Sequence, residues 1–341
     1  MPDKEIIKTS VFARIGFLGN PSDGFGGKTI SLPLKNFQAE TLVWQSPTFK
    51  LLSNSEDQDE YEHVGDMARY VRANGYYGGI RLVKAAIVSL KKYCEQHSIE
   101  FPGGNFTISY RSNIPRQSGL AGSSAIIVST IKSVMKFYKL PEASLPPEIL
   151  ANIAIAAETE ELGITAGLQD RVVQSFDAPV YMDFGPAAFK RHGGIFGEYK
   201  KINPNLFPEM YIAWNDKPSE SGKIHSDVKS RFLDGDQKVV NAMARFAEIA
   251  ESGMSALLKR DHAKLCDLAD QNFDLRRKIY GDSVIGADNL AMIKLARKFG
   301  AAAKFPGSGG AIIIIPRNKG QADIILEEFA RRKYNIERVV V

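Results

Sequence analysis

The apolar residues of this chain follow two different periods, and each period marks one kind of secondary structure. Short runs rich in β-branched and aromatic residues, bounded by Gly, Pro, Ser or Asn, are typical of strands. These runs lie at 12–19, 29–34, 37–44, 105–113, 179–184, 210–215 and 337–341. Apolar residues at helical spacing predict helices. The predicted helices span 79–97, 123–138, 146–162, 168–176, 227–279, 288–299 and 322–333.

A mixture of strands and helices in this order predicts an α+β protein. With 341 residues, the chain is long enough for two domains, each with its own core. Polar residues predict loops at 53–62 and 185–194, and we place the domain boundary just after the second loop. The domains expected are therefore residues 1–200 and 201–341.

A glycine-rich stretch, PRQSGLAGSSA at 115–125, connects a predicted strand to a predicted helix. Gly119 and Gly122 let a ligand approach the main chain closely, while Ser123 and Ser124 stand at the start of the helix. Unpaired amides and the positive end of the helix dipole meet at such a point, so the loop is a candidate phosphate site. It is not a Walker A loop, which needs Lys where Ser123 stands, and it lacks the G-x-G-x-x-G of dinucleotide-binding folds.

Carboxylates crowd the stretch 156–171, where Glu158, Glu160, Glu161 and Asp170 lie close together in sequence. Exposed helix ends explain Glu160 and Glu161, whereas two helices joined by a turn can bring another Glu and Asp170 together. A phosphate loop with carboxylates is the minimum set for Mg²⁺-assisted phosphoryl transfer. The D-F-G at 183–185 does not indicate a protein kinase, because the chain has no H-R-D-x-x-x-x-N segment.

Composition excludes several other classes of protein. The chain is 44% hydrophobic and 24% charged, with a net charge of +5, which is ordinary for a globular protein. We read its basic groups, including 276–278, as solvated helix faces and expect no nucleic-acid partner. The start of the chain has no apolar signal region and the longest apolar run, 311–315, is too short to span a bilayer. We expect a cytoplasmic protein with no membrane partner.

Three motifs of this sequence resemble those of the GHMP small-molecule kinases, in the same order and over nearly the whole chain. PRQSGLAGSSA resembles their phosphate-binding motif, KFPGSGGA at 304–311 resembles their C-terminal glycine turn, and ARIGFLGNPSD at 13–23 stands where their first motif lies. Longer stretches, including ELGITAGLQDR and NFDLRRKIYGD, resemble the plant-type glucuronokinases of that family. The resemblance implies a ribosomal-protein-S5-like N-terminal domain and a ferredoxin-like C-terminal domain, with ATP and Mg²⁺ as cofactors.

The resemblance also implies roles for individual residues. Asp170 matches the catalytic aspartate, Arg14 the basic residue that accompanies it, and Glu158 and Ser124 the Mg²⁺ ligands. Asp23 and Asn20 fall at sugar-binding positions. The residues implied in binding ATP are Pro115, Gly119, Leu120, Ala121, Gly122, Ser123, Ser124, Ala125, Gly307, Ser308 and Gly309.

The substrate implied by the resemblance is D-glucuronate, phosphorylated at its anomeric hydroxyl to supply UDP-glucuronate synthesis. Its carboxylate needs a cationic partner, and arginine suits a carboxylate best because its planar fork donates two parallel hydrogen bonds. Arg116, Arg171 and Arg81 are the candidates. Two alternatives stay open: a kinase for another sugar, of the galactose, arabinose or heptose type, and a protein on the same fold that senses ATP and sugar without turnover. Oligomeric state is not predicted.

Overall fold

The computed structural model describes residues 5–52, 78–215, 225–318 and 320–341, which form two compact units. The predicted loop at 53–62 lies outside these residues. Unit one comprises the chain up to Ala13 together with Phe37–Ile114 and Ala121–Asp177, and unit two comprises the rest. Strands β1 (Ile6–Leu18) and β2 (Lys28–Gln45) therefore contribute residues to both units, and so does the loop at 115–125.

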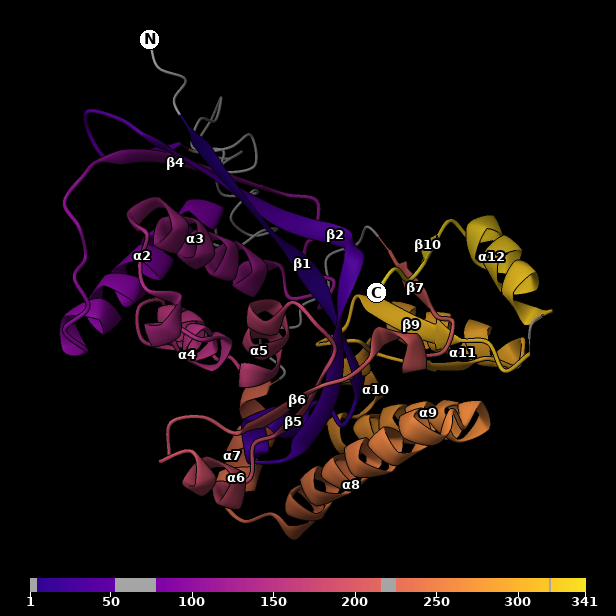
Figure 1. The fold of residues 1–341 in the computed structure, drawn as a ribbon. Coiled ribbons are helices and arrows are strands. Elements are labelled where there is room, and N and C mark those ends of the chain that lie inside the picture. Colours follow the sequence, from indigo (N-terminus) through magenta and orange to yellow (C-terminus); the bar gives the residue numbers. More distant parts are fainter. Residues whose placement is uncertain (1–4, 53–77, 216–224, 319) are drawn as a thin grey trace, which may run out of the picture. The chain divides into compact units, whose positions relative to one another are not determined.

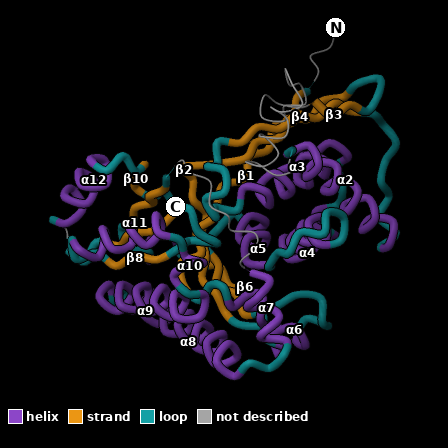
Figure 2. The backbone as a smooth tube through the Cα atoms, turned by 180° about the vertical axis from the view of Figure 1, so that it is seen from behind, coloured by secondary structure: helices purple, strands orange, loops and turns teal. Residues whose placement is uncertain are grey.

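Unit one combines part of a sheet with a group of helices (Figures 1 and 2). The C-terminal part of β2 pairs antiparallel with β4 (Phe106–Ser112), and β3 (Lys50–Leu52) pairs parallel with β4. The helices are α2 (Gly79–Gln96), α3 (Gly122–Tyr138), α4 (Pro147–Thr159) and α5 (Leu168–Phe176). They pack on one another, and α3 also contacts β4. All four helices were predicted from apolar spacing, and the prediction is confirmed.

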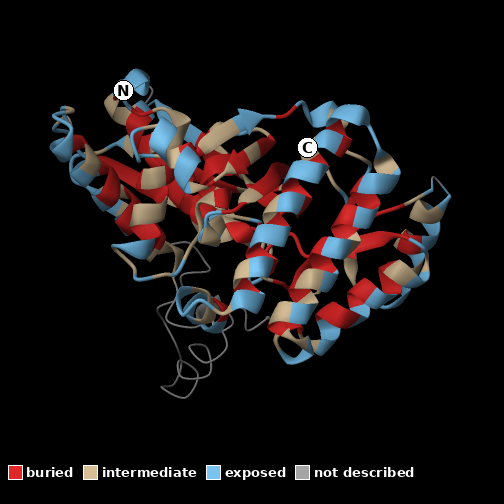
Figure 3. Ribbon diagram, turned by 90° about the horizontal axis from the view of Figure 1, so that it is seen from below, coloured by how far each residue is buried: buried red, intermediate tan, exposed pale blue. Residues whose placement is uncertain are grey.

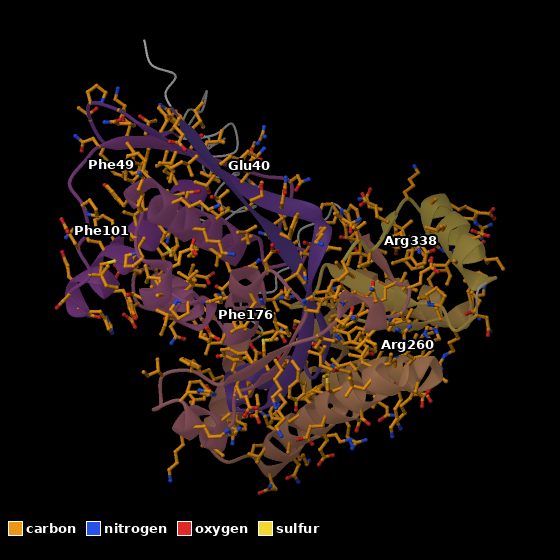
Figure 4. The ribbon with its side chains drawn as sticks, viewed as in Figure 1. Glu40, Phe49, Phe101, Phe176, Arg260 and Arg338 are labelled. Atoms are coloured by element: carbon orange, nitrogen blue, oxygen red, sulfur yellow. The ribbon has the colours of Figure 1, made fainter. Side chains whose placement is uncertain are left out.

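A buried carboxylate is held within the sheet of unit one. Glu40 on β2, labelled in Figure 4, is 2% exposed and lies opposite Arg111 in the ladder with β4. Its carboxylate forms ion pairs with Arg111 and with Lys8 of β1. Burial alone raises the pKa of a carboxyl, but hydrogen bonds from these two cations lower the pKa of Glu40 below its ordinary value. The ion pair between Glu40 and Arg111 supports the register in which β2 and β4 pair.

Strand β2 corrects one prediction, because the two strands expected at 29–34 and 37–44 are one continuous strand. Pro33 falls between the stretch of β2 that pairs with β5 and the stretch that pairs with β4. A proline lacks the amide that a ladder requires, so it is tolerated at a position where these ladders leave a gap. The break predicted between the two strands, at residues 35–36, is wrong.

Unit two has a four-stranded antiparallel sheet with the order β10-β7-β9-β8. Its strands are β7 (Tyr211–Trp214), β8 (Ala302–Lys304), β9 (Ala311–Ile315) and β10 (Asn335–Arg338). In chain order this is 4-1-3-2, the arrangement of a ferredoxin-like sheet. The run AIIII of β9 is buried at every position, as expected of a central strand. Beside the N-terminal part of β2 lie β5 (Val180–Asp183) and β6 (Glu198–Lys201).

The helices of unit two show where the predicted boundaries were wrong. They are α6 (Pro186–Arg191), α7 (His225–Leu233), α8 (Gln237–Lys259), α9 (His262–Tyr280), α10 (Asp282–Ile285), α11 (Ala287–Lys298) and α12 (Gln321–Arg331). The single pattern at 227–279 is divided because Asp236 and Asp261 each cap a new helix, accepting from the amides of Lys238 and Lys264. Buried and exposed residues alternate along the helices in Figure 3, as amphipathic packing requires.

Candidate functional site

The glycine loop at 115–125 ends in the N-terminus of α3, which begins at Gly122, one residue before the predicted serines. Gln117, Gly119 and Ala121 have φ values of +53°, +68° and +64°, so the loop turns through three left-handed residues. This conformation is easy for glycine and disfavoured for alanine. Ala121 provides no side-chain cap. The first amides of α3 have no acceptor within the helix and are therefore available to a ligand such as a phosphate.

Ala121 is held in its unusual conformation through its carbonyl oxygen. Gln174 Nε2, from α5, donates to this oxygen at 3.0 Å, and the Ser124 hydroxyl donates to it at 3.2 Å. The amide of Ala125 also donates to it, at 3.1 Å. The start of α3 is thus fixed by a side chain from another helix.

A buried carboxylate stands beside this helix start. Glu158, near the end of α4, is 1% exposed, and its Oε1 accepts a hydrogen bond from the Ser123 hydroxyl at 2.8 Å. Its Oε2 accepts from Arg171 Nε at 2.6 Å and from Arg171 Nη2. Two groups 35 residues apart in sequence are thereby joined. Glu158 was singled out from the sequence, and the structure supplies its partners.

The hydroxyl next to Glu158 belongs to Ser123 and not to Ser124, the serine expected to act as a metal ligand. Ser124 is fully buried and its hydroxyl donates to the carbonyl of Ala121. Adjacent residues of a helix point about 100° apart, so only one of the two serines faces Glu158. Ser123, expected to contribute its backbone amide, therefore has the better-placed oxygen for a cation. Sequence spacing did not distinguish them.

Asp170 lies in the first turn of α5, next to Arg171 in sequence. Arg171 Nη1 is 3.4 Å from Asp170 Oδ2 and donates to the carbonyl of Gly167 at 2.8 Å. The Asp170 side chain is 18% exposed, whereas that of Arg171 is only 6% exposed. The Arg171 guanidinium thus forms ion pairs with both Glu158 and Asp170, and the Asp170 side chain remains accessible to solvent.

The oxygens present suit Mg²⁺, which binds one or two protein oxygens and keeps water or phosphate as its other ligands. Ser123 Oγ and Glu158 Oε1 lie 2.8 Å apart and provide two such oxygens. Over the part of the chain that the structure describes, no group of three or more His, Cys, Asp or Glu side chains is arranged to hold a metal by itself. A cation here would need ligands from a bound nucleotide.

In unit two, Arg14 lies between the two glycine turns. Its Nη1 donates to the carbonyl of Gly119 at 3.1 Å and to that of Pro306 at 2.6 Å. The turns also meet directly, since a Cβ at Gly307 would stand 2.0 Å from the oxygen of Gly119. A Cβ at Gly119 would stand 2.8 Å from the amide nitrogen of Ser308. Both glycines are therefore required by close backbone contact.

Asn20 was predicted from the resemblance to bind the sugar, but its side chain has internal partners at both ends. Its Oδ1 accepts from Lys304 Nζ at 2.8 Å and its Nδ2 donates to the carbonyl of Phe305 at 3.4 Å. Lys304 also donates to the carbonyls of Gly16 and Phe305, at 2.7 and 2.6 Å. Burial, with Arg276 and Arg14 nearby, lowers the pKa of Lys304 well below its ordinary value. These contacts favour a structural role for Asn20.

Arg276 is the residue that sequence reasoning missed most clearly, because we read 276–278 as a solvated face. It is 3% exposed and donates to the carbonyls of Gly307 and Ser308, at 2.8 and 3.4 Å. Asn272, one turn earlier, accepts from the amide of Gly19 at 2.8 Å. Buried residues at 272, 276 and 280 share one face of α9. The spacing of four residues between these positions was the signal in the sequence that they lie on one buried helix face.

Of the remaining predicted sugar-binding residues, Asp23 and Arg116 lie in unit two and Arg81 lies in unit one. Asp23 is partly exposed in a short turn after β1, close enough to act on the pKa of both Arg276 and Tyr280. Arg116 is exposed in the first glycine loop. Arg81, in the first turn of α2, is partly exposed. Their roles in sugar binding stay predictions.

Free amides at the start of α3 and the buried Glu158–Ser123 pair, on an α+β fold, are features that a small-molecule phosphotransferase requires. The chain belongs to the GHMP kinases: residues 81–177 match "GHMP kinases N terminal domain" and residues 254–336 match "GHMP kinases C terminal". Kinases of this family use ATP. The prediction of an α+β, two-domain GHMP kinase fold is confirmed.

Among individual proteins, the chain is similar to two plant kinases. It is 41% identical over 342 residues to "Probable glucuronokinase 2" of Arabidopsis thaliana, covering 99% of this chain and 92% of that protein. It is 39% identical to "Glucuronokinase 1" of the same plant, covering 97% and 91%. The solved structure of Lactococcus lactis galactokinase complexed with galactose has a TM-score of 0.74 at 15% identity, covering 99% of this chain and 94% of that one, and shows the likeness in fold.

Among the described residues, no helix is both long and apolar enough to cross a bilayer.

Proposed function

We propose that this chain is a sugar 1-kinase that transfers the γ-phosphoryl group of ATP to the anomeric hydroxyl of D-glucuronate. The observation that carries the proposal is the identity of 41% and 39% to two plant glucuronokinases over almost the whole chain. The product, glucuronate 1-phosphate, would supply UDP-glucuronate synthesis. We further propose a cytoplasmic enzyme organised as an N-terminal domain at 1–200 and a C-terminal domain at 201–341.

The phosphate groups of ATP are assigned to the glycine loop at 115–125 and the helix that follows it. Two arguments support this assignment. The free amides and the dipole at the start of α3 favour an anion. Arg14, fixed by the carbonyls of Gly119 and Pro306, adds a positive charge next to the loop. Gly307, Ser308 and Gly309 would support the loop from the second turn.

We assign Asp170 as the general base that receives the proton of the anomeric hydroxyl. A carboxylate suits this role when it is accessible to the substrate and held in place, and Asp170 is partly exposed beside Arg171. Ser123 and Glu158 would hold Mg²⁺, with Ser124 supporting the loop from beneath. Bound Mg²⁺ neutralises charge on the phosphate oxygens.

The carboxylate of glucuronate requires a cation, and the contacts rank the candidates. Arg171 is occupied by Glu158, which favours a role within the protein. Arg116 is exposed in the phosphate loop and is therefore our first choice, with Arg81 second. Replacement of Arg116 by Ala should lower kcat/KM for glucuronate by a factor that corresponds to about 2–5 kcal/mol, the cost of losing one partner of a charge pair that the bound sugar buries, and should affect glucose much less.

The test of the function is ATP-dependent phosphorylation across a panel of free sugars: D-glucuronate, D-galacturonate, D-glucose and D-galactose. We expect the highest kcat/KM with D-glucuronate and a phosphate at C1 of the product. A preference for a neutral sugar would refute the uronate assignment and leave a sugar 1-kinase of another specificity. Absence of phosphorylation with every sugar, despite binding of ATP, would favour a sensing protein.

A further inference from the structure

Two side chains of helix α5 hold the surroundings of Ser123 and Glu158, one by contact with Glu158 and one by contact with Ala121. The first is Arg171, whose side chain is 6% exposed. Its Nε and Nη2 donate to Glu158 Oε2, while its Nη1 donates to the carbonyl of Gly167 at the start of the same helix. The guanidinium is thus fixed between its own helix and the end of α4. A planar fork held at both edges leaves Glu158 little freedom to rotate.

The contacts divide the two oxygens of Glu158 between different partners. Oε2 receives both donors from Arg171, whereas Oε1 receives the hydroxyl of Ser123 at 2.8 Å. A carboxylate oxygen accepts about two hydrogen bonds or ligands. The remaining capacity of Glu158 therefore lies on Oε1, next to Ser123 Oγ. Arg171 in this way restricts Glu158 to one oxygen for a cation.

The second side chain from α5 is Gln174, one turn after Arg171. Its Nε2 donates to the carbonyl of Ala121 at 3.0 Å and to that of Phe12 at 3.2 Å. Ala121 is the left-handed N-cap residue that precedes α3, two positions before Ser123. This bond comes from outside the loop and opposes relaxation of Ala121, so the direction of Ser123 depends on Gln174 as that of Glu158 depends on Arg171.

We propose that Arg171 and Gln174 are positioning residues that present Ser123 and Glu158, one oxygen from each, to the divalent cation of the nucleotide. This inference rests on the proposed function, since it takes the cation from that reaction. It also gives α5 a second task beside that of Asp170. The competing role for Arg171 is direct contact with the sugar carboxylate, and the two roles affect different constants.

The test is direct titration of the full-length protein with Mn²⁺ in the presence of ATP, with free Mn²⁺ followed by electron paramagnetic resonance. For Arg171→Gln we expect the Kd of Mn²⁺ to rise about tenfold or more, as when the partner of a metal ligand is removed. Arg171→Lys should recover part of the loss, because it keeps the charge but not the fork. Gln174→Met should raise the Kd while leaving the charge of the protein unchanged.

Steady-state kinetics separate the competing role. The Mg²⁺ concentration for half-maximal rate should rise in all three variants, while KM for the sugar stays within about twofold of the wild-type value. Loss of an ion pair with the substrate would instead raise KM for the sugar by much more than that. Arg317→Gln is the matched control, because it removes an arginine from Asp267 and Asp270 in unit two and should leave the Kd of Mn²⁺ unchanged.

Two results would overturn the inference: an unchanged Kd of Mn²⁺ in variants whose circular dichroism matches the wild type, or a rise in sugar KM without a change in metal dependence. If Arg171→Gln does not fold, Arg171→Lys and Gln174→Met decide the matter. A wild-type protein that phosphorylates no sugar would refute the proposed function instead. The titration with Mn²⁺ would still test the inference, because it measures metal binding and not turnover.

Discussion

The contact between the two glycine turns predicts a large effect from a single methyl group, in the substitution Gly307→Ala. The new Cβ would stand 2.0 Å from the carbonyl oxygen of Gly119 and 2.9 Å from Arg14 Nη1. The obstructing oxygen belongs to the backbone and cannot rotate away, so one turn must retreat from the other. Overpacking of this kind costs about 1–3 kcal/mol. The hydrogen bond from Arg14 to Gly119 is also disturbed, at about 1.5 kcal/mol or more for a charged donor.

We therefore expect Gly307→Ala to lower the free energy of unfolding by about 2–4 kcal/mol, measured by equilibrium urea denaturation. KM for ATP should rise as well, because both turns would move. Gly103→Ala is the matched control, since a Cβ there would meet nothing within 4 Å. The backbone of neither glycine is left-handed, so the two variants differ in contact and not in strain. Equal stability of the two variants would refute the reasoning.

Three further predictions concern single side chains. Asp170→Asn should lower kcat by about 10²–10⁴-fold with little change in KM for ATP or sugar, and near-normal turnover would exclude its role as base. Ser123→Ala should raise the Mg²⁺ concentration for half-maximal rate, whereas Ser124→Ala should only reduce stability. If Ser124→Ala raised that concentration and Ser123→Ala did not, Ser124 would be the metal ligand, as the sequence predicted. Burial and two neighbouring arginines lower the pKa of Lys304. Between that pKa and 10.5 the unfolded chain binds more protons, so the free energy of unfolding should rise with pH in this window. Lys304→Met should flatten that rise in urea denaturation at successive pH values.

Secondary structure followed most closely from the sequence in helices with one buried face. The helices at 79–97 and 168–176 were predicted almost to the residue, because their apolar spacing reflects packing on a single side. Boundaries failed where a capping carboxylate divided a helical pattern, as at Asp236 and Asp261, and where a strand continued through the polar residues 35–36. Such effects depend on which neighbour supplies or withholds a hydrogen bond, and a local window does not contain that neighbour.

The residues of the candidate site could be found in the sequence, but their partners could not. Glu158 and Asp170 stood out by composition, whereas the choice of Ser123 over Ser124 depends on the direction of α3 relative to α4. Arg171 and Arg276 are similar in character to any surface arginine until their burial is known. A long cationic side chain can be solvated or enclosed, and only its surroundings in three dimensions decide which.

The buried face of α9 restricts where natural variants of this chain can carry insertions or deletions. Asn272 and Arg276 reach the turn after β1 and the second glycine turn from successive helical turns. An insertion of a single residue between them would rotate one against the other by ~100° and separate them by 1.5 Å along the axis. The two turns could not then both keep their partners. Length changes should therefore accumulate at the exposed junction of α8 and α9, around Arg260, and be absent from the stretch between Asn272 and Tyr280.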